Sequence, residues 1–444
     1  MPNELTVGTI RVGDFIDFYE ETPQVKATLE RSEQGISVVL SWSEPDSPYA
    51  FWFLGADTFR ITNAGRPAAA APPPPKRALF YDSHGFVLLT RCWPRGYHTH
   101  ALGPGTGRLW AKAAILDVNR DIEFDKPHGL RTEISGLREW LGVTSWEQTV
   151  TWQGEATAAL SSKRASSIEV GSYRGLTISL VPTWQIQPDP ALDRRIVLDL
   201  LYCTTRSSTG EDWGTHLHAH RAFRDLLVIS RWQPESCVEA AALREDDPLL
   251  TMDGKEHGDQ WREVIVPQDE RTPQPAGYRP HLIKYEDLKE AGLLRWLTLR
   301  DQFARALDPV ISSIDLREVT PSALLAQTGP GLEALGYLLL LRDGVSAKKA
   351  AATPLKVRLE RILNDLHGCL PFDGSTWARS TVEAYNGLKH ANRDEPDPVD
   401  MINAWRESIL VTRTWVALEL GVPPTAAKER LQHDPQRHPY QKTL

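Results

Sequence analysis

The chain has 444 residues, which is too long for one ordinary hydrophobic core and predicts two or three domains of ~150 residues each. An apolar fraction of 41% and a charged fraction of 24% exclude wholesale disorder and a fibrous architecture. The formal net charge of −8 argues against a protein whose whole surface binds nucleic acid, while leaving room for a local basic patch.

Cysteine spacing and hydropathy indicate the compartment. No CxxC pair and no zinc-finger spacing of Cys and His occurs, so we expect neither a disulfide framework nor a bound metal. The N-terminal residues lack a secretory signal, and the longest apolar run, Tyr337 to Leu341, is far shorter than the ~20 residues of a membrane span. We therefore expect a cytoplasmic protein without a cofactor and without a membrane segment. The four cysteines are Cys92, Cys203, Cys237 and Cys369.

Residues 1–183 are predicted to form a β-rich domain, because short β-branched and aromatic runs alternate with Gly, Pro, Asp and Ser. Val25, Ala27 and Leu29 alternate with polar residues, which is the period of a strand with one buried face. A sandwich or barrel-like sheet with some helix is the expected architecture. The strands are expected at Val25 to Leu29, Ile36 to Trp42, Phe51 to Leu54 and Leu79 to Thr90.

A proline-rich segment interrupts this domain at Arg66 to Arg77, which has the sequence RPAAAAPPPPKR. Four consecutive prolines lack backbone donors and favour extended polyproline geometry. We interpret the segment as a surface spacer loop; a polyproline ligand for a partner's aromatic groove is the alternative.

The glycine-rich segment GPGTGR, Gly103 to Arg108, is predicted to be a turn before a strand at Leu109 to Leu116. A phosphate-binding loop is disfavoured because no Lys-Ser or Lys-Thr pair follows it.

Residues 184–266 are predicted to be a mixed α/β extension of the first domain, with a helix from His216 to Arg231. This helix contains THLHAH. On a strand its three histidines would share one face as a metal trio, whereas on a helix only His216 and His220 share a face and His218 points elsewhere. The helical spacing that follows favours the helix, so we do not assign a metal to these histidines.

Residues 267–280, rich in proline and charge, are predicted to be a linker. Residues 281–424 carry amphipathic periodicity throughout and predict an all-α up-down bundle, and residues 425–444 are predicted to be a polar tail. Expected helices are Leu293 to Ile311, Pro321 to Leu341, Ala347 to Leu366, Ser375 to Ala391 and Pro398 to Leu420.

The segment WARSTVEAYNGLKHANRDEPDPVD, Trp377 to Asp400, carries the most specific signal. Asn386 and His390 are four residues apart and share one helix face, ~6 Å apart along the axis. Lys389 and Arg393 flank the histidine, and residues 347–393 contain eight Lys or Arg against four Asp or Glu. This helix end is therefore predicted to accept a phosphate.

The segment resembles the signature of HEPN domains, in which an Arg is followed by a polar residue and, after four to six intervening positions, by a His close to the last helix. HGLRTEISGLREWLGVTSW, His128 to Trp146, is similar to the β-rich N-terminal domain of ApeA-type proteins of bacterial phage defence. Together the two resemblances span most of the chain.

This resemblance implies an anti-phage defence protein whose HEPN domain is a metal-independent endoribonuclease, active as a homodimer on RNA, with tRNA as one candidate. An unknown phage-derived trigger would act on the N-terminal domain. His390 would move a proton and Asn386 would orient it or the phosphate, and a histidine with an ordinary pKa near ~6.5 suits that role. Lys389, Arg393 and Arg379 are the candidate RNA-binding residues.

Tyr385 departs from the pattern, because it occupies the position at which many HEPN ribonucleases carry the motif arginine. We include Tyr385 with His390 and Asn386 in the candidate catalytic set, although a tyrosine cannot supply the charge of a guanidinium. The alternative is a catalytically degenerate HEPN domain that serves as an RNA-binding or dimerising adaptor. A weaker hypothesis makes the β-rich domain a carbohydrate binder.

Overall fold

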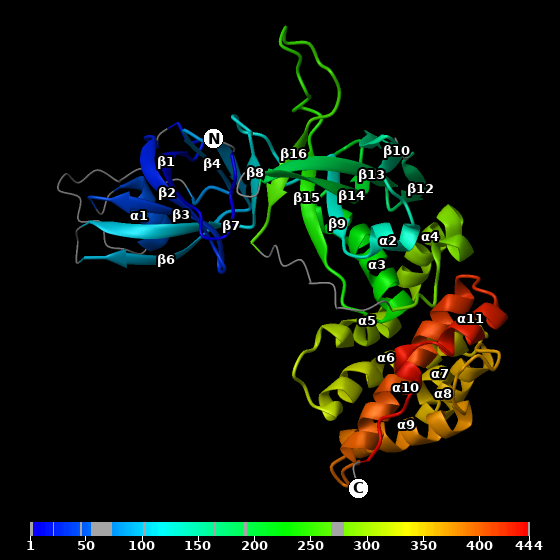
Figure 1. The fold of residues 1–444 in the computed structure, drawn as a ribbon. Coiled ribbons are helices and arrows are strands. Elements are labelled where there is room, and N and C mark those ends of the chain that lie inside the picture. The colour runs from blue at the N-terminus through cyan, green and yellow to red at the C-terminus, as the bar shows by residue number, and fades with distance from the viewer. Residues whose placement is uncertain are drawn as a thin grey trace. The chain divides into compact units, whose positions relative to one another are not determined.

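The computed structural model describes residues 3–20, 22–44, 47–54, 73–100, 104–162, 166–189, 193–267 and 279–442. Residues 10–265 form a large antiparallel sheet with accompanying helices, and the C-terminal half is mostly helical, which confirms the α+β prediction (Figure 1). The chain divides into two compact units, each with its own core. Unit 1 comprises Met1–Glu133, Thr204–Leu217 and Val238–Arg271, and unit 2 comprises Ile134–Cys203, His218–Cys237 and Thr272–Leu444.

Unit 1 is built on antiparallel strands in the order β15-β16-β8-β5-β4-β1-β2-β3-β7-β6. In β2 the expected alternation is present, since Ala27 and Leu29 are buried while Lys26 is exposed. The bounds are β1 Ile10–Ile16, β2 Val25–Ser32, β3 Gly35–Trp42, β4 Arg77–Asp82, β5 Gly85–Thr90, β6 Trp93–Thr99, β7 Gly105–Ala111, β8 Ala113–Leu116, β9 Gly129–Ile134, β15 Cys237–Leu243 and β16 Trp261–Ile265.

The strand expected at Phe51 to Leu54 is wrong, because these residues belong to helix α1 (Pro48–Leu54). Proline is tolerated in the first turn of a helix, where its missing N–H costs nothing. Tyr49 and Trp52, three residues apart, are buried and both contact Phe15 edge-on. Packing against the sheet therefore overrides the β propensity of this aromatic run.

The turn expected at GPGTGR is also wrong for its described residues, because Gly105 to Arg108 lie within β7; Gly103 lies outside the described part. A Cβ at Gly107 would approach Phe53 Cδ2 to 2.3 Å, and one at Gly105 would approach Trp42 Cζ2 to 2.5 Å. These glycines let aromatic rings pack directly on the strand backbone, rather than giving the chain a turn.

Unit 2 contains a sheet β12-β13-β14 and a two-stranded ribbon β10-β11, with most of helix α3. Helix α3 agrees with the helix expected from His216 to Arg231 and begins three residues earlier. The bounds are α2 Leu137–Leu141, β10 Trp146–Gln153, β11 Glu155–Ser162, β12 Ile168–Tyr173, β13 Leu176–Asp189, β14 Arg194–Arg206 and α3 Trp213–Arg231.

The remainder of unit 2 is a helical array. The helix expected from residue 347 to 366 is divided by Pro354, whose ring cannot continue a helix. The helix expected at 293–311 begins earlier, with a capping interaction between Lys284 and Asp287, and is divided at Phe303. The bounds are α4 Tyr285–Gln302, α5 Ala304–Ser312, η1 Ser313–Asp315, α6 Pro321–Arg342, α7 Ala347–Ala352, α8 Leu355–Asn364, α9 Gly374–Lys389, α10 Pro398–Glu419, α11 Pro424–Leu431 and η2 Pro435–Arg437.

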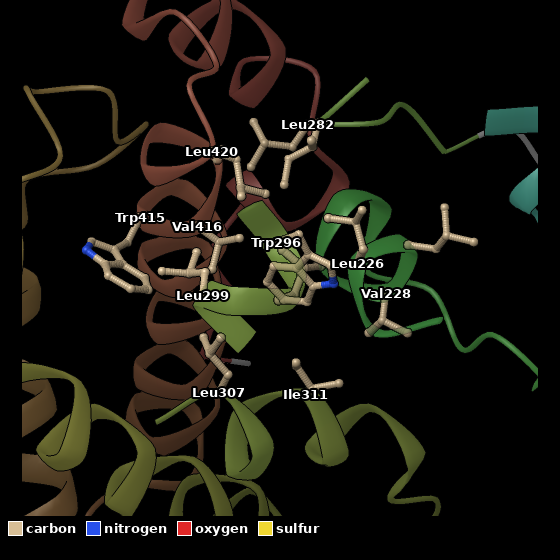
Figure 2. Close-up of a cluster of buried hydrophobic side chains, with 14 of the residues drawn as sticks. Leu226, Val228, Leu282, Trp296, Leu299, Leu307, Ile311, Trp415, Val416 and Leu420 are labelled. Carbon is tan, nitrogen blue, oxygen red and sulfur yellow. The ribbon is translucent and has the colours of Figure 1, made fainter. Parts of the chain in front are cut away.

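The core of unit 2 is continuous from α3 through α4 to α10 (Figure 2). Trp296 of α4 is fully buried, and its indole N–H donates to the backbone carbonyl of Ala222 in α3 at 2.7 Å. Phe303 and Trp415 contact each other with ring centroids 4.7 Å apart. Helix α10 is therefore packed in the same core as α3.

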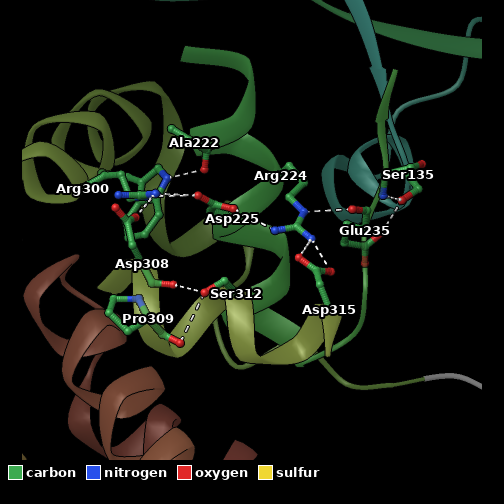
Figure 3. A network of polar contacts seen from close by, with 12 residues as sticks. Ser135, Ala222, Arg224, Asp225, Glu235, Arg300, Asp308, Pro309, Ser312 and Asp315 are labelled. Carbon is green, nitrogen blue, oxygen red and sulfur yellow. Dashed lines mark hydrogen bonds and ion pairs between the residues drawn. The ribbon is translucent and has the colours of Figure 1, made fainter. Parts of the chain in front are cut away.

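A polar network runs beside this core and links α3 to α4 and η1 (Figure 3). The carboxylate of Asp225 accepts from both Arg224 and Arg300, at 3.1 and 2.9 Å. Arg224 also donates to both carboxylate oxygens of Asp315 at 2.7 Å. Because Arg224 pairs with one carboxylate of α3 and one of η1, it links these two elements.

Helix α6 is the centre of the bundle and contacts α5, α8, α9 and α10. Among the described helices it is the one that is long and apolar enough to cross a membrane by composition. Half of that apolar window is buried by the neighbouring helices. A helix that is apolar on all sides is equally typical of a bundle centre, and its contacts favour that interpretation here.

Two secondary-structure elements lie at or beyond expected domain boundaries. The boundary at 183/184 falls inside β13, and the expected polar tail contains α11, which buries Ala427 and Leu431. Two buried apolar residues in eight are too few to reveal that helix by periodicity. Most of the proline-rich segment, at 66–72, and most of the expected linker, at 268–278, lie outside the described residues.

Candidate functional site

Helix α9 positions the candidate residues. Asp373 caps its start by accepting from the backbone N–H of Thr376 at 2.7 Å. His390 ends it: the histidine has φ −118° and ψ 106°, yet its N–H still donates to the carbonyl of Asn386 at 3.0 Å. The imidazole therefore lies at the junction between α9 and the loop that follows it.

The two faces of α9 differ in exposure. Ala384 and Tyr385 are among the residues buried against the bundle. The opposite stripe follows helical spacing and carries residues that are exposed or half-buried, so that Asn386 and His390 lie together on the accessible side, as expected. The stripe consists of Arg379, Glu383, Asn386 and His390.

The loop after His390 is held against the helix by close packing at Gly387. A Cβ on Gly387 would lie 2.6 Å from Pro396 Cγ and 3.0 Å from the carbonyl oxygen of Asp394. The N–H of Arg393 donates to the carbonyl of His390 at 3.0 Å, which closes a tight turn directly after the histidine. The loop therefore folds back beside the last turn of α9.

Tyr385 lies on the buried face and is only 7% exposed. Its ring packs directly on α6, since a Cβ at Gly329 would approach Tyr385 Cε2 to 2.2 Å. Burial, with a smaller contribution from Glu333, raises the pKa of the Tyr385 hydroxyl above its ordinary value. Within one protomer the structure does not bring the Tyr385 side chain to the face that carries Asn386 and His390.

The three candidate cations differ in their partners. Lys389 is exposed, pairs with Glu333 of α6 at 3.3 Å and lies 5.5 Å from the ring centroid of Tyr385. Arg393 and Arg379 are exposed and make no side-chain hydrogen bond or ion pair with any described residue. The positive charges that remain available to a ligand are therefore the two arginines.

Neither the His390 ring nor the side-chain amide of Asn386 has a hydrogen-bond partner within the described ranges. In the sequence, Lys389 was the nearest cation to the histidine, but the structure shows it engaged by Glu333. No spacing rule within α9 could reveal that contact, because the glutamate comes from α6. The close packing at Gly329 and Gly387 was also missed, although glycines inside an otherwise helical pattern are a recognised sign of close approach.

Two histidines of THLHAH, His216 and His218, form hydrogen bonds with neighbouring residues. In unit 1, buried His216 contacts Thr205 Oγ1 at 2.8 Å and the carbonyl of Pro127 at 3.1 Å, and burial lowers its pKa. In unit 2, His218 Nε2 lies 2.9 Å from Asp301 Oδ1. Within the described ranges, no three Cys, His, Asp or Glu residues are grouped as metal ligands would be.

Comparison with known proteins identifies the two parts of the chain. The family model for ApeA N-terminal domain 1 matches residues 18–236, and that for Apea-like HEPN matches residues 341–426, which include α7 to α10. No curated protein and no solved structure matches the chain. The two matched segments span about two thirds of the sequence, in the order expected. The chain therefore belongs to the ApeA-type family of anti-phage defence proteins, with an ApeA N-terminal domain followed by an Apea-like HEPN domain.

Proposed function

We propose that the HEPN domain is a metal-independent endoribonuclease, with RNA as substrate and tRNA as one candidate, and that it acts in the cytoplasm once the N-terminal domain has sensed a phage-derived trigger. The observation that supports this is an accessible imidazole, His390, without a protein partner among the described residues and with Asn386 one turn before it. Both polar groups are therefore open to a ligand that approaches this face of α9.

The chemistry would be an attack of a ribose 2′-oxygen on the adjacent phosphorus. The new 2′-O–P bond forms as the P–O5′ bond breaks, the 2′-hydroxyl proton leaves to a base and the departing O5′ oxygen receives a proton. His390 is suited to one of these proton transfers, because a histidine exchanges its proton near neutral pH. Asn386 would orient the histidine or a phosphate oxygen.

A homodimer would complete this arrangement. One protomer offers a single imidazole on this face, whereas the reaction needs both a base and an acid. Two copies related by a twofold axis would bring two His390 rings into one cleft, with Arg393 and Arg379 as phosphate contacts. Tyr385 takes no direct part in the proposal for one protomer, because its ring is buried.

The experiment compares purified full-length wild type with His390→Ala on total RNA, in EDTA, with and without a phage lysate. We expect cleavage by the wild type to fall at least ~100-fold in the variant, the usual contribution of a general acid or base. His257→Ala, which removes another exposed histidine, is the matched control and should retain activity. Cleavage by the wild type in no condition, or equal cleavage by His390→Ala, would refute the ribonuclease.

The second candidate is an adaptor that binds RNA or dimerises without cutting. It is favoured by position 385, where the family's arginine is replaced by a buried tyrosine. The adaptor predicts RNA binding that weakens in Arg393→Ala, together with unchanged RNA length after incubation. The ribonuclease predicts shortened RNA in the same samples.

A further inference from the structure

The segment 434–442, which we name the C-terminal strap, follows α10 in the antiparallel direction. Its residues meet positions of α10 that step back toward the start of that helix: Asp434 pairs with Arg413, the carbonyl of Gln436 accepts from Arg406, and Tyr440 meets Asn403. In Figure 1 the C-terminal segment runs beside α10 to the end of the bundle where α9 and α10 are joined.

The N-terminal end of the strap is anchored to α3 through Arg413. This arginine is fully buried, and its guanidinium donates to the carbonyls of Ile229 and Ser230, at 2.7 and 3.0 Å, in the last turn of α3. Its remaining nitrogen pairs with Asp434 at 2.7 Å. One buried cation therefore joins α10, the strap and the end of α3, a helix within the segment matched by the N-terminal family.

The C-terminal end of the strap is anchored at the start of α10, where the loop that follows His390 ends. The side-chain amide of Asn403 donates to the carbonyl of Tyr440 at 3.0 Å and accepts from its N–H at 2.8 Å. Lys442 then pairs with Asp397 at 3.3 Å and Asp400 at 3.1 Å. Asp397 caps α10 by accepting from the N–H of Val399, so the strap holds the residue at which the loop ends.

We infer that the C-terminal strap is a positioning element: it fixes the loop between His390 and α10, and it makes the order of that loop depend on the contact between Arg413 and the end of α3. The inference rests on the proposed function for its relevance to catalysis. Its structural content is independent of that function, because every contact in the series lies within unit 2.

Hydrogen–deuterium exchange of the full-length protein tests this positioning. Lys442→Glu and Asn403→Ala should each speed exchange of the amides in residues 388–400 roughly two- to fivefold, the change that loss of one exposed polar pair produces. Lys428→Glu makes the same charge change on an exposed face of α11, away from the strap, and should leave those amides unchanged. Unchanged exchange in both strap variants, or an equal increase in the control, would overturn the inference.

The link to α3 is tested by Asp434→Asn, with circular dichroism used to establish that the variant is folded. Exchange should rise both at residues 226–231 and at residues 388–400. A rise confined to the α3 end would show that the strap does not transmit the change. RNA cleavage is measured in parallel. If the wild type is inactive but the variants show the expected exchange, the ribonuclease is refuted and the positioning role of the strap is retained. If the wild type is active but the variants show no change in exchange, the positioning role is refuted and the ribonuclease is retained.

Discussion

Two histidine-bearing helices of this protein differ in how their polar side chains are satisfied. In α3, His216 contacts a hydroxyl and a backbone carbonyl, and His218 contacts Asp301. At the end of α9, neither His390 nor Asn386 has such a partner in the described part of the chain. THLHAH, which has three histidines, is thus a structural motif, whereas the single histidine His390 is available for a ligand.

The difference follows from burial. His216 lies in the first turn of α3 and is fully buried, where an unsatisfied polar group would cost about 1–3 kcal/mol. A residue at a helix end projects into a loop and can remain hydrated at little cost. Four predictions, in addition to the His390→Ala experiment, distinguish these two settings.

The largest expected effect is at Tyr385, which lies on the buried face of α9. Tyr385→Arg would place a charge against Gly329 in an apolar seam, so we expect the free energy of unfolding to fall by about 4 kcal/mol. Tyr385→Phe is the matched control and should change stability by less than about 1 kcal/mol. Urea denaturation measures both; a stable, newly active arginine variant would instead indicate a degenerate site that the lost arginine can restore.

The second prediction concerns pH and the buried region around His281. Burial, with smaller contributions from Arg231 and Arg413, lowers the pKa of His281 to about 3. The unfolded chain takes up a proton below pH ~6.5 while the native state does not, so this stability is complete above that pH and is lost as the pH falls toward 3, at about 1.4 kcal/mol per unit. His281→Gln should flatten the pH dependence of unfolding between pH 6.5 and 4.5. A pH profile parallel to that of wild type would contradict the prediction; His257→Gln is the control.

The third prediction tests the satisfied histidine itself. His216→Ala removes a buried ring and two hydrogen bonds, and should lower the free energy of unfolding by about 2 kcal/mol. Any RNA cleavage should be retained below the melting temperature, because the residue is structural. Thermal denaturation and the RNA assay, run together, check this; loss of cleavage in a folded His216→Ala protein would show that His216 has a role beyond stability.

The smallest effect is expected at the exposed cation beside His390. Arg393→Ala should weaken RNA binding uniformly across sequences and reduce the slope of log affinity against log salt by about 1, as loss of one phosphate contact does. Lys389→Ala should change the slope less, because Glu333 already neutralises that lysine. Equal slopes for wild type and Arg393→Ala would remove Arg393 from the binding surface.

Much of the fold could be predicted from local pattern. The starts of α6 and α10 coincide with those expected, since Pro321 and Pro398 mark the first turn of each helix. The errors arose where tertiary packing decided the outcome. The aromatic run of α1 has strand-like composition, and the glycines of β7 have turn-like composition, but both are explained by contacts with residues distant in sequence.

The candidate site could be predicted only in part. Helical spacing was sufficient to place Asn386 and His390 on one face of α9, and both lie on the accessible face of that helix in the structure. The burial of Tyr385 and the pairing of Lys389 depend on α6, whose register against α9 is not encoded in either segment alone. The catalytic roles themselves stay predictions.

The absence of a side chain at Gly387 has a consequence for how such a site can vary. Because Pro396 occupies the space that a Cβ would need, even an alanine there would push the loop outward and carry the chain beyond His390 with it. The position of the residues that follow His390 therefore depends on the absence of a single methyl group at position 387, which carries no functional group of its own.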